Sequence, residues 1–162
     1  MKNKNGSKPK KKKSSSLKKR NFLYWGGVTL TIAGIVGIGD AIFTVYKGIL
    51  MSSADSQAYS SILTNLNITQ SQASTAVITV GSILMLFYML MTGTGVVGIF
   101  SWHRTFTKRN LFWVSLVLMG LDLLFYFLGS IDLWLLLVTG AADLLYCIGV
   151  YKNFTPKLKQ FS

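Results

Sequence analysis

Four long apolar segments, separated by polar or basic stretches, dominate the pattern of this chain. They run from about Phe22 to Tyr46, Thr75 to Phe100, Leu111 to Leu128 and Leu133 to Tyr151. Each is close to or above the roughly 20 helical residues that cross the hydrocarbon core of a bilayer. A spanning segment of one chain must be helical, because a helix satisfies its own backbone hydrogen bonds. The pattern therefore predicts an all-α protein, a bundle of four transmembrane helices.

The polar ends of the chain flank a single predicted membrane domain, residues 22–154. Residues 1–21 are rich in Lys, Ser and Asn and have no apolar periodicity. Such a composition is typical of a disordered segment, because it offers too little apolar surface to offset the entropy of ordering. Residues 155–162 form a short basic tail. We expect one folded domain between two cytoplasmic tails.

The distribution of positive charge predicts the orientation. Ten of the 17 Lys and Arg residues lie in the first twenty positions. Basic residues also occur between the second and third spans and after the fourth. The loops after the first and third spans have none, with the one exception of Lys47 at the outer end of the first span. Cytoplasmic loops carry the excess of Lys and Arg in membrane proteins. This pattern predicts a multi-pass protein of the cell membrane with both termini in the cytoplasm.

Three of the five acidic residues, Asp40, Asp122 and Asp143, lie inside predicted spans. An aspartate at the centre of a membrane helix costs about 2.5–3.5 kcal/mol, so these three form a candidate intramembrane polar or ion site. With a rise of about 1.5 Å per residue, Asp122 and Asp143 are predicted at a similar depth, with Asp40 nearer the outer surface. Two carboxyl groups close together in a low dielectric cannot both ionise easily.

Three interpretations of these aspartates remain open at this point. They could be hydrogen-bonding clasps, satisfied by Thr and Tyr hydroxyls of neighbouring helices. They could line a proton or cation path, or they could contact polar residues of a partner protein. Asp132, at the start of the fourth span, is expected only to cap that helix.

The sequence Gly-Ile-Gly-Asp at 37–40 resembles the active-site motif of intramembrane aspartyl proteases. The resemblance covers four residues and would imply that Asp40 is catalytic together with a second aspartate. The Tyr-Asp motif that those enzymes commonly carry is absent from this sequence. We therefore predict that the protein is not an enzyme.

Small residues offer a second explanation of the glycines. Their spacing of four places them on one helical face, where small side chains allow close helix packing. We expect the first span to pack against the second, or against its copy in a dimer. The predicted packing residues are Ala33, Gly37 and Ala41 on the first span, and Thr94 and Gly98 on the second.

The N-terminal tail is predicted to contact anionic lipid headgroups, because each Lys near an anionic leaflet contributes about 1 kcal/mol. Nucleic acid is not a favoured partner, because the tail lacks aromatic residues for stacking on bases. One His, one Cys and no Glu argue against a metal site, and no motif indicates a cofactor. The predicted lipid-contacting residues are Lys10, Lys11, Lys12, Lys13, Lys18, Lys19 and Arg20.

The layout as a whole resembles small four-helix membrane proteins of unknown function from Gram-positive bacteria. The resemblance rests on the glycine-rich first span, the polar loop after it, the GTGVVGIF end of the second span and the basic turn HRTFTKRN. It implies the fold but no activity. We expect a non-enzymatic accessory, scaffold or regulatory protein, partnered by a second copy or another membrane protein. The alternative is a small transporter or channel subunit that uses the membrane aspartates, and a more remote one is the protease.

Overall fold

The computed structural model describes residues 12–53, 69–101 and 108–154, and within these ranges the chain is helical with no strand. Each helix contains a segment long and apolar enough to cross a membrane. The prediction of an all-α protein with four helices long and apolar enough to span a membrane is therefore confirmed. The helices are α1 (Lys12–Ser53), α3 (Gln70–Ser101), α4 (Lys108–Phe127) and α5 (Leu133–Phe154).

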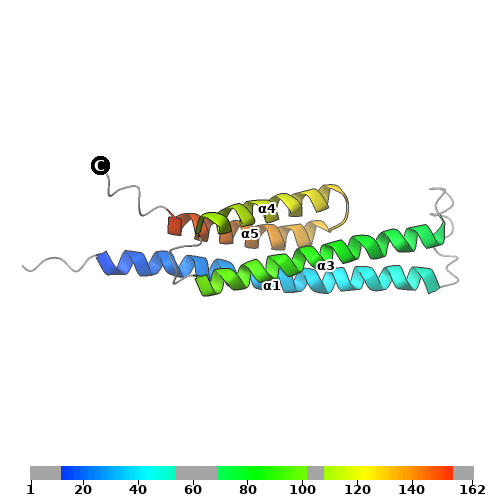
Figure 1. Cartoon of the computed structure of the whole chain (residues 1–162), viewed down its shortest axis with the longest axis horizontal. Helices are drawn as coiled ribbons and strands as arrows, with labels where there is room; N and C mark the ends of the chain where they lie inside the picture. The colour runs from blue at the N-terminus through cyan, green and yellow to red at the C-terminus, as the bar shows by residue number, and fades with distance from the viewer. Residues whose placement is uncertain (1–11, 54–68, 102–107, 155–162) are drawn as a thin grey trace, which may run out of the picture.

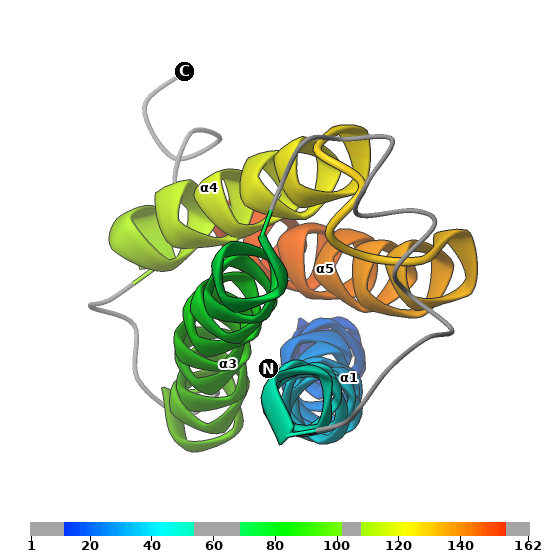
Figure 2. The same cartoon turned by 90° about the vertical axis from the view of Figure 1, so that its right-hand side faces the viewer.

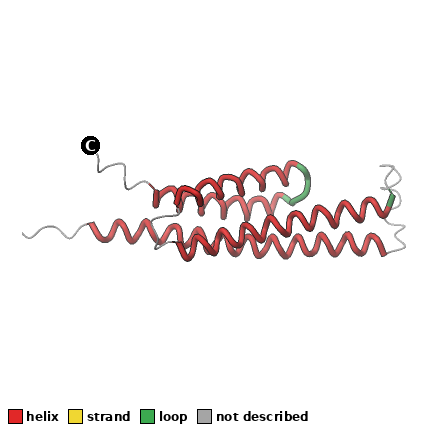
Figure 3. Tube along the Cα trace, viewed as in Figure 1, coloured by secondary structure: helices red, strands yellow, loops and turns green. Residues whose placement is uncertain are grey.

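The helices form two antiparallel pairs, α1 with α3 and α4 with α5 (Figure 1). The second pair packs on the first mainly through α5 and α1 (Figure 2). We call the end where α1 begins and α5 ends the basic end, and the end where α1 finishes and α3 begins the distal end. At about 1.5 Å per residue, α4 and α5 are roughly 30 Å long, whereas α1 is roughly 63 Å and α3 roughly 48 Å. The longer pair reaches past the α4–α5 turn at the distal end (Figure 3).

The first helix begins earlier than the hydrophobic pattern predicts. Residues 12–21, expected to belong to a disordered tail, continue α1, while residues 1–11 lie outside the described ranges. Extending a formed helix fixes one residue per new hydrogen bond, whereas starting one is costly. Lys, Arg and Leu are also good helix formers, and no proline follows Pro9 in this stretch. The apolar pattern therefore indicates the extent of the membrane span, whereas the helix itself begins earlier, at Lys12.

A capping box explains why α3 begins at Gln70 and not near Thr75. The hydroxyl of Thr69 accepts a hydrogen bond from the backbone N–H of Gln72 at 3.3 Å. In return, the backbone N–H of Thr69 donates to the Gln72 side chain at 3.0 Å. This reciprocal pair satisfies two backbone donors that the first turn of a helix otherwise leaves free.

The tight turn between α4 and α5 is built on Gly129, whose φ of +68° favours glycine. Its N–H donates to Tyr126 O, and that of Ser130 donates to Phe125 O, both at 2.9 Å, which is the Schellman arrangement. The carbonyl of Asp132 accepts the first helical bond of α5 from Leu136 N at 3.0 Å. Asp132 therefore occupies the N-cap position, as expected from the sequence.

Small residues spaced by seven hold α1 and α3 in close contact. A Cβ added to Gly95 would lie 2.8 Å from Gly27 O, and one added to Gly81 would lie 3.3 Å from Ala41 O. Further toward the distal end, the Ser74 hydroxyl donates to Gly48 O at 2.8 Å. Such backbone approach is possible only where side chains are minimal. The facing positions are Gly27, Gly34, Ala41 and Gly48 on α1 and Ser74, Gly81 and Gly95 on α3.

The predicted packing residues divide between two interfaces. Ala33, Gly37 and Ala41 are buried, and Gly37 and Ala41 face α3 of the same chain. Thr94 and Gly98 contact α5 instead of α1, which corrects their predicted pairing. Tyr146 of α5 donates its hydroxyl to Thr94 O at 3.2 Å, and its ring covers Gly98. Gly98 is three residues past the α1-facing Gly95, which turns it about 60° toward α5.

Candidate intramembrane acid site

Asp122 on α4 and Asp143 on α5 both lie in the interior of the bundle. Both side chains have an exposed fraction of zero, and the charge of Asp122 acts on Asp143. Asp122 lies five residues before the distal end of α4, whereas Asp143 lies ten residues after the distal start of α5. Asp143 is therefore roughly 7.5 Å further from the α4–α5 turn than Asp122, and the similar depth expected from the sequence stays a prediction.

Neither carboxyl group has a hydrogen-bond partner within the described ranges. All four carboxyl oxygens are buried and unsatisfied, as are the hydroxyls of Tyr88 on α3 and Ser115 on α4. A buried polar group without a partner costs about 1–3 kcal/mol, and a charged one costs more. The site therefore needs a bound proton, water or cation to be satisfied.

The threonines offered by the clasp interpretation bond to their own helices. Thr139 is buried next to Asp122, but its hydroxyl donates to Leu135 O at 2.9 Å. Thr31 and Thr92 likewise donate to carbonyls one turn back, at 2.8 Å each. A hydroxyl has a single proton to donate, so a threonine bonded in this way cannot also satisfy a carboxylate. Thr139 is nonetheless close enough to the Asp122 carboxyl group to interact with it, so it is the one of these threonines that keeps the clasp interpretation open.

Tyr88 connects the acid pair to the distal end of the bundle. Its ring lies over Gly37 of α1, and the phenol interacts electrostatically with both Asp122 and Asp40. The side chain is completely buried and its hydroxyl is free to donate. Tyr88 therefore lies between Asp122 in the interior and Asp40 nearer the distal end.

Asp40 does not join the deeper pair. It is partly buried, and its charged neighbours are Asp132 and Lys47. The antiparallel α1–α5 register, in which Gly26 faces Tyr146, places Asp40 opposite Asp132 at the start of α5. Asp40 is thus level with the distal ends of α4 and α5, separate from the acid pair as the depth estimate indicates.

The arrangement around the Gly-Ile-Gly-Asp motif offers no room for a substrate backbone at Gly37. The Tyr88 ring already fills the space in which a Cβ at Gly37 would lie. Gly39, in contrast, has no neighbour within 4 Å beyond its own helix. The first glycine of the motif therefore serves interhelical packing.

Other predicted site residues lie elsewhere in the chain. Lys10 and Lys11 lie outside the described ranges, whereas Lys12, Lys13, Lys18, Lys19 and Arg20 belong to the first turns of α1. Their contact with lipid headgroups stays a prediction. Over residues 12–53, 69–101 and 108–154, no group of three His, Cys, Asp or Glu side chains could hold a metal ion.

Ser115 is the site residue that sequence reasoning missed. It is 1% exposed and precedes Asp122 by seven residues, so both lie on one face of α4. A polar residue two turns from an intramembrane acid, on the same face, is the signal that identifies it.

No family model, curated protein or solved structure matches this chain. The class of protein is therefore inferred from the fold alone. The fold is that of a multi-pass helical membrane protein with two buried acidic residues.

Proposed function

We propose that this protein takes up a proton or a monovalent cation at Asp122 and Asp143, as a small transporter or channel subunit of the cell membrane. The observation that carries the proposal is the complete burial of four carboxyl oxygens without a protein donor. Intramembrane acids that face a bundle interior are a recurrent feature of proton and ion pathways.

The chemistry of the pair favours a small, singly charged occupant. A proton bound by either carboxyl group, or one cation near both, reduces the repulsion of two buried negative charges. Among the described residues no third His, Cys, Asp or Glu joins the two acids to form a metal-binding group. The site therefore lacks the larger set of charged ligands that favours a tightly bound divalent ion.

A series of polar residues supports access from the distal end. Asp132 and Asp40 interact at that end, and Tyr88 interacts with both Asp40 and Asp122. The phenol can donate and accept a proton, so it suits a relay between the two levels. The positive-inside rule assigns the basic end to the cytoplasm, so this route would open toward the outside.

Flux measurements on the purified full-length chain in liposomes test the proposal. We expect proton or monovalent-cation flux from the wild type, and at least ten-fold less from Asp122→Asn and Asp143→Asn. Asn keeps the size and hydrogen-bonding capacity of Asp but cannot bind a proton or balance a cation. The control is Ser82→Ala, because the Ser82 side chain is exposed on α3, donates to Ile78 O of its own helix at 2.8 Å and lies outside this route. Flux that is unchanged in both interior variants would contradict the proposal.

An accessory or scaffold role is the second candidate, supported by the distal extension of α1 and α3. Beyond the level of Asp132, α1 continues to Ser53 with a large exposed apolar surface that includes Phe43 and Tyr46. If α4 and α5 match the bilayer thickness, this part of α1 lies in the interface or beyond it, where a partner protein could cover it. Crosslinking and affinity capture from native membranes would identify that partner. Capture of only copies of this chain would favour an oligomer.

A further inference from the structure

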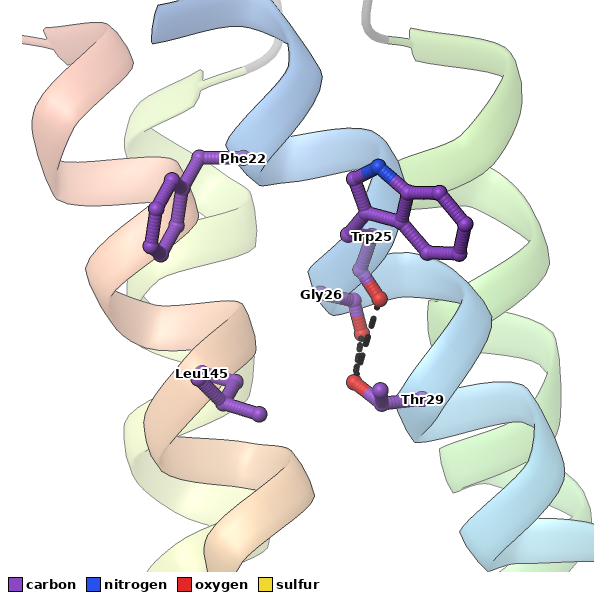
Figure 4. Close-up of a pocket in the computed structure, with 5 residues that line it drawn as sticks. All are labelled: Phe22, Trp25, Gly26, Thr29 and Leu145. Atoms are coloured by element: carbon purple, nitrogen blue, oxygen red, sulfur yellow. Dashed lines mark hydrogen bonds between the residues drawn. The ribbon is translucent and has the colours of Figure 1, made fainter.

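A groove between α1 and α5 lies near the basic end of the bundle (Figure 4). It has a volume of about 220 Å³ and is lined by Phe22, Trp25, Gly26, Thr29 and Leu145. Gly26 brings the two helices together, because a Cβ there would lie 2.9 Å from Tyr146 Cα. Larger side chains flank this contact. Leu145 belongs to α5, whereas Phe22, Trp25 and Thr29 belong to α1. They form the walls of the groove.

The groove faces outward from the bundle within the predicted spans. Trp25 is 63% exposed and Leu145 is 42% exposed. In a bilayer, apolar side chains that face outward at this depth meet acyl chains. The groove exceeds the roughly 150 Å³ of an apolar cavity that accommodates benzene, so a stretch of hydrocarbon chain fits it.

A positive charge stands at the end of the groove nearest the basic end. The Lys152 ammonium lies 4.2 Å from the centre of the Phe22 ring. Leu145, Gly149 and Lys152 are spaced by four and three residues, so one face of α5 leads from the groove wall to this charge. The aromatic ring orients the ammonium without neutralising it.

The α1 side adds further positive charge in sequence. Lys18 and Lys19 precede Phe22 by four and three residues, one helical turn toward the basic end. The acids of the described chain do not reach this point, although Asp143 precedes Leu145 by only two residues, because the Asp143 side chain is completely buried. Asp40 is level with the distal ends of α4 and α5, and the interior pair is enclosed by the bundle. A ligand in this groove therefore meets the Lys152 cation at the end of an apolar slot.

We infer that the α1–α5 groove binds one anionic glycerophospholipid from the leaflet at the basic end. One acyl chain lies along Trp25, Thr29 and Leu145, and the phosphate lies beside Lys152. The site is independent of the acid pair, and it differs from diffuse attraction of the N-terminal tail because it requires the groove as well as the charge.

Native mass spectrometry of the full-length chain, released from phosphatidylglycerol or phosphatidylcholine nanodiscs, tests this inference. We expect one retained phosphatidylglycerol per chain and little phosphatidylcholine. Lys152→Gln should weaken retention about five-fold, as expected for one lysine at an anionic headgroup, and Lys152→Arg should restore it. Thr29→Phe should also reduce retention by filling the groove. Among the described residues the Thr29 hydroxyl bonds to Trp25 O and Gly26 O of its own helix, so this change removes no described hydrogen bond between helices.

Matched controls separate the groove from general electrostatics. Lys47 lies 4.4 Å from the Phe43 ring at the distal end, and Lys47→Gln removes the same kind of lysine where no groove is described. Ile35→Phe adds an aromatic ring to an exposed position of α1 outside the groove. Both controls should retain the lipid as the wild type does. Equal losses for Lys47→Gln and Lys152→Gln, or unchanged retention in Thr29→Phe, would overturn the inference. A lipid-free dimer that Thr29→Phe dissociates would assign the groove to a second copy.

Discussion

Replacement of Gly95 by alanine should push α1 and α3 apart, whereas the same change two residues earlier should not. A Cβ at Gly95 would lie 2.7 Å from Thr31 N and 2.8 Å from Gly27 O, both backbone atoms. Thr31 also has its hydroxyl bonded to Gly27 O at 2.8 Å, so neither atom can move alone. A Cβ at Gly93 has no neighbour within 4 Å beyond its own helix.

The magnitude follows from the displacement that the new methyl group requires. The α1 backbone must retreat by roughly 0.8 Å to restore an ordinary contact distance of about 3.5 Å. Overpacking of this kind typically costs about 1–3 kcal/mol. Both substitutions also gain about 0.5–1 kcal/mol of helix propensity, which cancels in the comparison. Gly95→Ala should therefore be about 1–3 kcal/mol less stable than Gly93→Ala.

Reversible unfolding in mixed micelles, followed by circular dichroism, measures the free energy of unfolding of both variants under identical conditions. The wild type should fall between them, with Gly93→Ala the most stable. Equal unfolding free energies for the two variants would refute the close α1–α3 contact and the seven-residue pattern behind it. If Gly93→Ala alone were less stable than the wild type, α1 would have to pack on the Gly93 face of α3 and not on the Gly95 face.

Three further substitutions test other parts of the structure. Replacing both Asp122 and Asp143 by Leu should raise the free energy of unfolding by about 1–4 kcal/mol, because apolar residues replace unpartnered buried acids; the clasp interpretation expects a loss. Gly129→Ala should lower the free energy of unfolding by about 1–2 kcal/mol because of the positive φ of Gly129. Gly120 has open space around it, so Gly120→Ala should not lower the free energy of unfolding in the same assay. Thr69→Ala should cost about 1 kcal/mol and speed amide exchange in the first turn of α3, and unchanged exchange would argue against the capping box.

The sequence predicts the four spans well because lipid leaves the backbone few alternatives. It predicts the helix ends less well, because the hydrophobic pattern indicates where the chain meets lipid, whereas a helix can continue beyond that region. The signal for the start of α3 is nonetheless present in the sequence. Thr69 and Gln72 have the spacing of a capping box, and the polar residues around them obscure it. The start of α1 depends on helix propagation through lysines, which a hydrophobicity pattern does not detect.

The candidate site was predictable in its acids but not in their surroundings. The rise per residue is enough to place Asp122 and Asp143 inside their spans, whereas their relative depth depends on where α4 ends and α5 begins. Whether Thr139 donates to a carboxylate or to its own helix depends on a side-chain torsion, which the sequence does not specify. The partner of Gly98 likewise depends on how all four helices pack, so a spacing of small residues on one helix leaves it undetermined.

Infrared spectroscopy of the protein in lipid bilayers tests whether Asp122 and Asp143 bind a proton or a cation, because it observes their carboxyl groups themselves. We expect a protonated-carboxyl band in the wild type that shifts on exchange into D₂O or weakens as a monovalent cation is added. We also expect that this band is absent from the variant in which both Asp122 and Asp143 are replaced by Asn. Identical carboxyl spectra of the wild type and this double variant across the pH range would contradict such binding.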